Sequence, residues 1–198
     1  MTHQGGANNG KIVEVRETHG MPPKAAKKRP LLGFTDSEKV NEVSNKELPL
    51  IIIVEIRDHD VARCLVDEGN SVYILYQDTF EKLGLRREYL KPYNDTDLHG
   101  FNETSMCPWG YVTLSVMFGE EMDERTVETP FLAVMVVSIY NCILGRPTLV
   151  VLDAVTSTVQ LKTKYHYRNE HMATVYADLK AAGRCHKAWR KLPAPQST

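Results

Sequence analysis

The sequence predicts an all-β domain, with a linker before it and a partly helical extension after it. From Leu48 onward, short runs rich in β-branched and aromatic residues alternate with turn residues, a pattern typical of strands in a sandwich or barrel. The chain has 198 residues, of which 42% are hydrophobic, and this is enough for one core. The predicted strands lie within LIIIVEI, VARCLV, SVYILY, GYVTLSVMF and TPFLAVMVV.

Two hairpins and one further strand are expected. RDHD, residues 57–60, lies between two apolar runs and predicts a tight turn. Residues 98–116 predict a second hairpin, in which Gly100 and Gly110 flank a polar tip. Residues 154–165 alternate between apolar and polar side chains and predict a single strand.

Three helices are also expected. Residues 78–85 predict a short helix with Asp78 as its N-cap. A second short helix is expected over residues 145–154, with Pro147 in its first turn, where a missing N–H costs nothing. Residues 177–192 have a helix-forming composition.

The pattern divides the chain into three regions. Residues 1–46 are rich in Gly, Asn, Lys, Pro and Glu and lack a sustained period, which is typical of a disordered linker. Residues 47–165 form the expected folded domain. Residues 166–198 form a C-terminal extension that includes the third helix.

The charge balance gives no general reason to expect a polyanionic partner. The chain has 24 Lys and Arg against 25 Asp and Glu, a net charge of -1, so binding to nucleic acid or to a membrane surface would need a local patch. A basic run, PPKAAKKRP, is interpreted as a solvated part of the linker. Contact with RNA and a nuclear import signal are the alternatives for its cationic residues, Lys24, Lys27, Lys28 and Arg29.

Other features favour an intracellular protein with reduced thiols. The four cysteines form no C-x-x-C pair, so neither a zinc knuckle nor a disulfide framework is expected. The most apolar run, LPLIIIVEI, is far shorter than the roughly 20 residues that span a bilayer. The first residues lack the apolar segment of a signal peptide. We therefore expect no membrane partner, no secretion, and a cytoplasmic or nuclear location.

Two adjacent carboxylates interrupt an apolar segment, CLVDEGNSVYILY, residues 64–76. Asp67 ends a predicted strand, Glu68 follows it, and Gly69 permits a sharp turn. Burying an ionised carboxylate is costly unless it is paired or neutralised, so this position needs either solvent access or a chemical purpose. A turn carboxylate that caps backbone N–H groups is the structural alternative for Asp67.

A second segment, YNCILGRP (140–147), completes a pair of motifs. Together with Asp67-Glu68-Gly69 it resembles the two signature segments of retropepsin-like aspartic proteases. The resemblance is closest to the protease region of plant gypsy-type LTR retrotransposon polyproteins, where a D-x-G-S-S-x-D-I-L-like motif precedes Y-N-x-I-L-G-R-P-x-L. A looser similarity covers about residues 34–190, and the protease-like unit covers about 46–165.

This resemblance implies a retropepsin-like closed β-barrel lobe with two short helices, and it implies an aspartic endopeptidase. Such an enzyme needs two carboxylates that share one proton, so that one acts as a base on water and the other as an acid on the substrate carbonyl. The chain has a single D-x-G, so its second catalytic aspartate would be Asp67 of an identical subunit, across a two-fold axis. The implied substrate is a peptide, the retrotransposon polyprotein, and no metal or organic cofactor is implied.

The resemblance also assigns roles to three groups of residues. After the catalytic Asp67, the active-site loop contains Glu68, Gly69, Asn70 and Ser71. The flap, a hairpin that closes over the substrate, carries Gly100, Phe101, Asn102 and Glu103. The supporting motif, in which the glycine lets a strand pass close behind the loop, consists of Ile143, Leu144, Gly145 and Arg146.

Three positions depart from the pattern of the family. Glu68 stands where retroviral enzymes use Thr or Ser, whose hydroxyl braces the two active-site loops across the dimer axis. An ionised Glu cannot donate that hydrogen bond, and it adds negative charge beside the catalytic pair. Asn70 replaces a Ser, and Tyr73 stands where Asp is common. The alternative function is a catalytically inactive or domesticated retrotransposon fragment that acts as a dimerisation or peptide-binding module.

The remaining candidate residues carry less specific signals. His166, His171 and the pair Cys185-His186 show no recognised metal-ligand spacing, so we expect packing or solvated roles and no metal site. Trp109, beside Gly110, is compatible with lining a substrate cleft and equally with ordinary hairpin packing.

Overall fold

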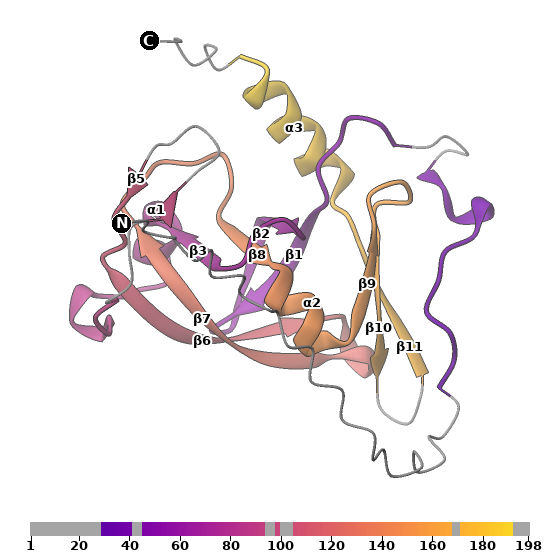
Figure 1. Cartoon of the computed structure of the whole chain (residues 1–198), viewed down its shortest axis with the longest axis horizontal. Coiled ribbons are helices and arrows are strands. Elements are labelled where there is room, and N and C mark those ends of the chain that lie inside the picture. Colours follow the sequence, from indigo (N-terminus) through magenta and orange to yellow (C-terminus); the bar gives the residue numbers. More distant parts are fainter. Residues whose placement is uncertain (1–28, 41–44, 94–97, 100–104, 168–170, 192–198) are drawn as a thin grey trace, which may run out of the picture.

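Six strands close into a barrel in the order β1-β2-β8-β3-β7-β6 (Figure 1). The computed structural model describes residues 29–40, 45–93, 98–99, 105–167 and 171–191. The closed barrel confirms the all-β prediction. Its strands are β1 (Ile51–Ile56), β2 (His59–Asp67), β3 (Tyr73–Tyr76), β6 (Gly110–Phe118), β7 (Arg125–Val134) and β8 (Cys142–Gly145).

The first hairpin of the barrel joins β1 to β2. Arg57 and Asp58 form its turn with φ of 52° and 61°, the positive values that a two-residue turn of type I′ requires. The tight turn expected at RDHD is therefore confirmed. Alternation along β1 then directs Ile52 into the main core. Ile51 faces the other way, into a smaller apolar cluster with the C-terminal helix.

Three α-helices flank the barrel: α1 (Gln77–Lys82), α2 (Arg146–Leu152) and α3 (Leu179–Trp189). Pro147 lies in the first turn of α2, as expected. The N-cap predicted for α1 is wrong, because β3 continues directly into the helix. Tyr76 is the cap, and Asp78 lies in the first turn, where its charge still favours the helix dipole. In the described part of the chain, no helix is long and apolar enough to cross a membrane.

Short elements complete the chain: the 3-10 helices η1 (Asp36–Glu38), η3 (Arg87–Tyr89) and η4 (Glu121–Asp123), and the two-residue strands β4 (Leu98–His99) and β5 (Ser105–Met106). Strands β4 and β5 pair antiparallel, so β5 lies within the stretch expected as the hairpin tip. The second arm expected after Gly110 is wrong, because β6 pairs with β7 and β1 in the barrel.

A three-stranded sheet lies beside the barrel, in the order β11-β10-β9 (Figure 1). The single strand expected over residues 154–165 is wrong, because β9 (Ala154–Ser157) and β10 (Lys162–Tyr167) are two strands joined by a turn. This turn contains no Gly, Pro, Asn or Asp, so the apolar and polar alternation continues through it unmarked. It is closed by hydrogen bonds between Ser157 and Gln160.

The C-terminal extension is part of the same folded body. The boundary expected after residue 165 falls inside β10, which pairs with β11 (His171–Tyr176). Ala173 and Val175 of β11 belong to the main core. Helix α3 begins at its N-cap Asp178, whose carboxylate accepts the backbone N–H of Ala181 at 2.9 Å.

Residues 29–40 run along the three-stranded sheet, which their composition did not indicate (Figure 1). Lys164 forms an ion pair with Glu38 at 2.6 Å, and Lys162 donates to the Glu38 carbonyl at 2.8 Å. The hydrogen bond from Lys164, with a smaller one from the Thr35 backbone, lowers the pKa of Glu38 to about 2. Arg29 pairs with Asp153 at 2.9 Å. Part of the region expected as linker is thus tied to the fold.

Replacing Tyr165 with phenylalanine should lower the free energy of unfolding by about 1–3 kcal/mol. The hydroxyl of this fully buried side chain shares its single hydrogen between the carbonyls of Phe118 and Asp123, at 3.1 and 2.8 Å, and both acceptors would lose this partner. Burial raises the pKa of Tyr165 to about 12, from an ordinary value of 10.

The raised pKa gives this prediction a pH dependence. Because the folded state favours the neutral phenol, the stabilisation is complete below pH 10 and is lost as the pH rises from 10 to about 12. Chemical denaturation of both proteins at several pH values measures this. The difference in stability between wild type and the Tyr165→Phe variant should shrink above pH 10, and a constant difference up to pH 12 would contradict the assignment.

Candidate active site

The order of the strands forces the loop after Asp67 to cross the end of another strand. Strand β8 lies between β2 and β3, and it runs parallel to β2 with Gly145 opposite Asp67. Residues 68–72, which connect β2 to β3, therefore pass over the end of β8. A Cβ on Gly145 would lie 2.3 Å from the carbonyl oxygen of Val72 and 2.7 Å from that of Asn70. Only a glycine leaves room for this crossing.

Four hydrogen bonds fix the conformation of the active-site loop. The backbone N–H of Gly69 donates to Oδ1 of Asp67 at 3.0 Å, and that of Asn70 donates to the Asp67 carbonyl at 3.2 Å, which closes a β-turn. Oδ1 of Asn70 accepts the N–H of Val72 at 3.0 Å. The backbone N–H of Arg146 donates to the Asn70 carbonyl at 2.8 Å, so the supporting motif is bonded directly to the loop.

Asp67 has the capping contact expected of a turn carboxylate, yet this contact uses one oxygen only. Among the described residues, no hydrogen bond to Oδ2 of Asp67 is formed, and the side chain is half-buried rather than enclosed. A capping role and a catalytic role are therefore compatible for Asp67. The hydrogen bond to Oδ1 orients the carboxylate, and Oδ2 stays open to water or a ligand.

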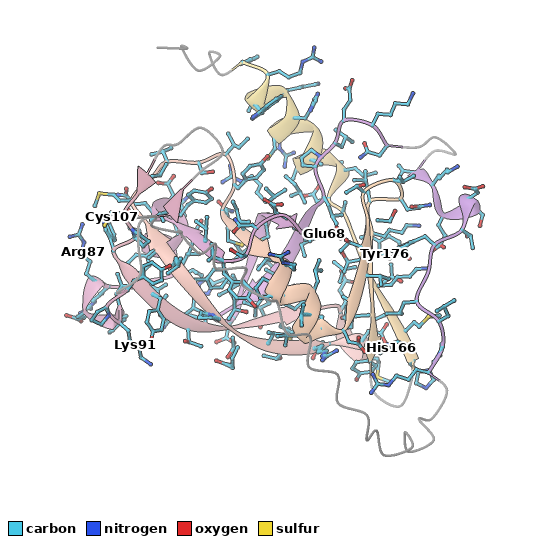
Figure 2. The ribbon with its side chains drawn as sticks, viewed as in Figure 1. Glu68, Arg87, Lys91, Cys107, His166 and Tyr176 are labelled. Atoms are coloured by element: carbon cyan, nitrogen blue, oxygen red, sulfur yellow. The ribbon has the colours of Figure 1, made fainter. Side chains whose placement is uncertain are left out.

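Glu68 points into solvent at the end of β2. Its side chain is exposed, and it forms no ion pair with any described residue. Figure 2 shows it well apart from Arg87 and Lys91, which lie at the other end of the barrel. Ser71 is likewise exposed, while Ile143 and Leu144 are buried in the wall behind the loop.

Asn141 connects three segments around the site, a role that the sequence did not reveal. Its side chain accepts a hydrogen bond from Arg63 at 2.8 Å and donates to the Ala62 carbonyl at 2.7 Å. Its backbone carbonyl accepts the N–H of Tyr76 at 3.3 Å. Asn141 thus holds β2, β3 and the start of β8 together, just before the supporting motif.

Tyr140 and helix α3 border the site on a further side. Ala181, Ala182 and Cys185 of α3 pack with Ile51, and the partly buried Leu65, Ile139 and Tyr140 join this cluster. Burial raises the pKa of Tyr140, and the negative charges of nearby groups, including Asp67, raise it further. The Tyr140 hydroxyl is therefore a neutral group within electrostatic range of the Asp67 carboxylate.

The expected flap is described only at its base. Gly100, Phe101, Asn102 and Glu103 lie outside the described residues, between β4 and β5. Trp109, which follows β5, packs against the core, with the Arg87 guanidinium 3.8 Å from its ring centre and Phe80 edge-on at 6.1 Å. These contacts favour the packing interpretation of Trp109.

The described residues contain no group of three or more His, Cys, Asp or Glu side chains placed to hold a metal ion. His166 instead lies 2.8 Å from the Pro30 carbonyl, and His186 lies 3.5 Å from Glu47. Within the basic run, Lys24, Lys27 and Lys28 lie outside the described residues, and Arg29 is paired with Asp153.

Comparisons with known proteins found similar solved structures, whereas no protein-family model and no curated protein matches the chain. The retroviral protease-like domain of Ddi1 from Leishmania major is 15% identical, with a TM-score of 0.48, over 67% of this chain and 95% of that one. EIAV protease in complex with the inhibitor HBY-793 is 23% identical, with a TM-score of 0.38, over 57% and 94%. A retropepsin-like aspartic protease from Rickettsia conorii is 20% identical, with a TM-score of 0.41, over 64% and 82%.

Proposed function

We propose that the chain is one subunit of a homodimeric aspartic endopeptidase of the retropepsin-like class. The observation that carries this proposal is the Asp67 carboxylate, which is held by a closed turn beside Gly145, with one oxygen free of hydrogen bonds from described residues. The two sequence motifs, Asp67-Glu68-Gly69 and Ile143-Leu144-Gly145-Arg146, thus meet in space at one point, although more than 70 residues separate them.

In the proposed mechanism, two Asp67 residues face each other across a two-fold axis and hold one proton and one water molecule between them. The ionised carboxylate removes a proton from the water, whose oxygen attacks the peptide carbonyl carbon, while the protonated carboxyl group donates its proton to the carbonyl oxygen. In the collapse of the resulting diol, the C–N bond breaks and the amine leaves with the proton that the first carboxylate took from the water. One diol hydroxyl returns its proton to the second carboxylate, which gives the carboxylic acid product and restores the single shared proton. By the resemblance, the flap, whose base is the pair of strands β4 and β5, would cover the substrate.

A peptide-cleavage assay tests this proposal. The full chain, incubated with a mixed peptide library in mildly acidic solution, should generate new amino termini, and a statine-type peptide should block the reaction because it imitates the diol. Specific activity should rise with protein concentration in the range where sedimentation shows dimer formation. Cleavage that persists with the statine compound, or that a sedimenting monomer performs at full rate, would overturn the proposal.

We propose further that the natural substrate is the polyprotein of a plant gypsy-type retrotransposon from which this chain derives. Support comes from the extended resemblance of YNCILGRP and of the flanking segments to that branch of the family. The proposal places the chain inside the cell, in the cytoplasm or nucleus, where its four free cysteines would stay reduced. A genomic neighbourhood that encodes reverse transcriptase, and fractionation of tagged protein with the cytosol or nucleus, are the expected findings.

The second candidate function is a catalytically inactive dimerisation or peptide-binding module, and the exposed Glu68 favours it. At this position a Thr hydroxyl would brace the two loops, whereas a carboxylate adds repulsion across the dimer axis. If the parent chain is inactive, the Glu68→Thr variant should gain measurable proteolysis and a tighter dimer, because the loop around it is already ordered by four hydrogen bonds.

The matched control is Glu88→Thr, at a surface glutamate of η3 remote from the loop, which should change neither property. A Glu68→Thr variant that stays inactive and monomeric would exclude the dimerisation role and favour a decayed, inactive fragment.

A further inference from the structure

A groove of about 640 Å³ lies between β11 and the barrel. One wall is the chain from Ala173 to Asp178, and the facing wall consists of Ile53 of β1 and the turn that follows β6. Three acidic residues line the groove, Glu120, Asp123 and Asp178, and no basic residue does. The charge of the lining therefore suits a cationic occupant.

The wall formed by β11 is a free strand edge. Strand β11 is the last strand of its sheet, so one of its edges has no strand partner in the described part of the chain. The N–H of Ala177 donates to the Leu161 carbonyl, on the β10 side. Because the direction of the N–H alternates along an antiparallel strand, the N–H groups of Thr174 and Tyr176 point to the free edge. An additional extended segment would bond to these groups.

The facing part of β1 also lacks a strand partner among the described residues. The pairing of β1 with β6 covers only Glu55 and Ile56. At the other end, the Ile51 carbonyl accepts the N–H of Asp178 at 2.7 Å, which closes the groove there. Ile53 lies between these two points, and its side chain is 48% exposed. An extended segment in the groove would thus contact a free strand edge on one side and an apolar side chain on the other.

The first described residues lie near the open end of this groove. The Pro30 carbonyl is 2.8 Å from Nε2 of His166, and His166 lies opposite Met172, the residue before Ala173. The wall formed by β11 is about 17 Å long. Residues 22–28, when extended, reach about 23 Å. The chain that precedes Pro30 is therefore long enough to enter the groove and to follow it to its closed end.

We propose that residues 22–28, the basic segment, bind in this groove as an extended strand. The segment reads PPKAAKK, and its three lysines match the three carboxylates of the lining in number and are opposite in charge. Binding would also cover the free edge of β11, which otherwise is open to pairing with another chain. The basic run thereby gains a partner within the chain in place of RNA, and this assignment does not depend on the endopeptidase function.

The tether at Pro30 sets the direction of the bound segment. Followed backwards from Pro30, the segment leads from the His166 end of the sheet to the Tyr176 end, and Figure 2 shows these two residues at opposite ends of the sheet. The segment therefore runs antiparallel to β11. Its carbonyl groups accept the N–H groups of Thr174 and Tyr176, and its two prolines keep this capacity because they lack only the N–H.

Two of the three carboxylates lie at the open end. The Asp123 carbonyl accepts the Tyr165 hydroxyl at 2.8 Å, and Tyr165 lies opposite Ala173. The Glu120 carbonyl in turn accepts the N–H of Asp123 at 3.1 Å, and both acidic side chains are exposed. Lys27 and Lys28 are the lysines nearest to Pro30 along the chain, so they are the ones that meet this acidic pair.

Hydrogen exchange of the full chain, followed by NMR at single amides, tests the proposal. The amides of Thr174 and Tyr176 should exchange at least about tenfold more slowly in wild type than in the Lys27→Glu/Lys28→Glu variant, because only the wild-type segment is attracted into the groove. The amide of Val175 points to β10 and should stay protected in both chains, which shows that the sheet is folded.

A charge exchange makes the test specific to this pair of surfaces. The Glu120→Lys/Asp123→Lys variant should lose the same protection, because its groove repels the lysines. The chain that combines all four substitutions should regain it, since the attraction returns with the signs exchanged. The matched control is Lys11→Glu/Arg16→Glu, which reverses two charges outside the basic segment and should leave the exchange unchanged.

Three results would overturn the proposal. The first is rapid exchange of the Thr174 and Tyr176 amides in wild type. The second is protection that persists in the Lys27→Glu/Lys28→Glu variant, which would assign the groove to another occupant; a dependence on protein concentration would identify that occupant as a second copy of the chain. The third is a combined variant that stays unprotected although its Val175 amide shows a folded sheet.

Discussion

The Asp67→Asn variant is expected to lose at least about a thousandfold in peptide-cleavage rate while it keeps its fold. An asparagine amide fits the same space, and its side-chain oxygen can still accept the N–H of Gly69, so the turn should survive. The amide cannot take a proton from water or hold one for transfer to the substrate, so the shared-proton chemistry is lost. Cleavage rate and thermal unfolding, measured side by side, check both parts.

Two controls test whether the loss of activity is specific to Asp67 and whether catalysis needs the Asp67 residues of both subunits. Asp58→Asn alters an exposed carboxylate in the β1–β2 turn and should leave the cleavage rate unchanged. When wild type and Asp67→Asn chains are mixed in equal amounts and allowed to exchange, about a quarter of the dimers should carry two intact aspartates. Activity per wild-type chain should then fall by about half. An unchanged activity per wild-type chain would show that each subunit works alone, and cleavage that survives Asp67→Asn would remove the catalytic assignment.

Gly145→Ala is expected to destabilise the folded chain by about 3 kcal/mol and to disturb the Asp67 turn. A Cβ at this position would lie 2.3 Å from the Val72 carbonyl oxygen and 2.7 Å from that of Asn70, and both contacts are with backbone that cannot rotate away. The backbone of Gly145 has a φ of -76°, which alanine adopts readily, so the cost arises from crowding alone. Chemical denaturation measures the loss, and the cleavage rate should fall with it because the loop must move.

Gly183→Ala is the matched control for this substitution. Gly183 lies inside α3, and a Cβ there meets no atom within 4 Å. Because alanine is the better helix former, this variant should be as stable as wild type or more stable by up to about 1 kcal/mol. The structure indicates that the loop backbone leaves no room for a Cβ at position 145. Equal stability of the two alanine variants would contradict this.

Features encoded in neighbouring residues could be predicted from the sequence. The runs of β-branched residues marked the strands of the barrel, and RDHD marked the β1–β2 turn, because strand alternation and turn preference act over a few residues. The same holds for Pro147 at the start of α2. The sequence-based predictions were wrong where no local residue marked the turn or the helix start. The β9–β10 turn has no turn-forming residue to reveal it, and Asp78 lost the cap position because β3 continues directly into α1.

The strand pattern and the two motifs around Asp67 and Gly145 could be recognised from short stretches of the sequence. The position of β8 between β2 and β3, and hence the crossing of the loop over Gly145, depends on the folded arrangement of the strands. The packing of residues 29–40 and of α3 on the body of the protein likewise becomes visible only in the folded chain. These features depend on contacts between residues that are distant along the chain, and such contacts are set by strand order and packing rather than by local preference.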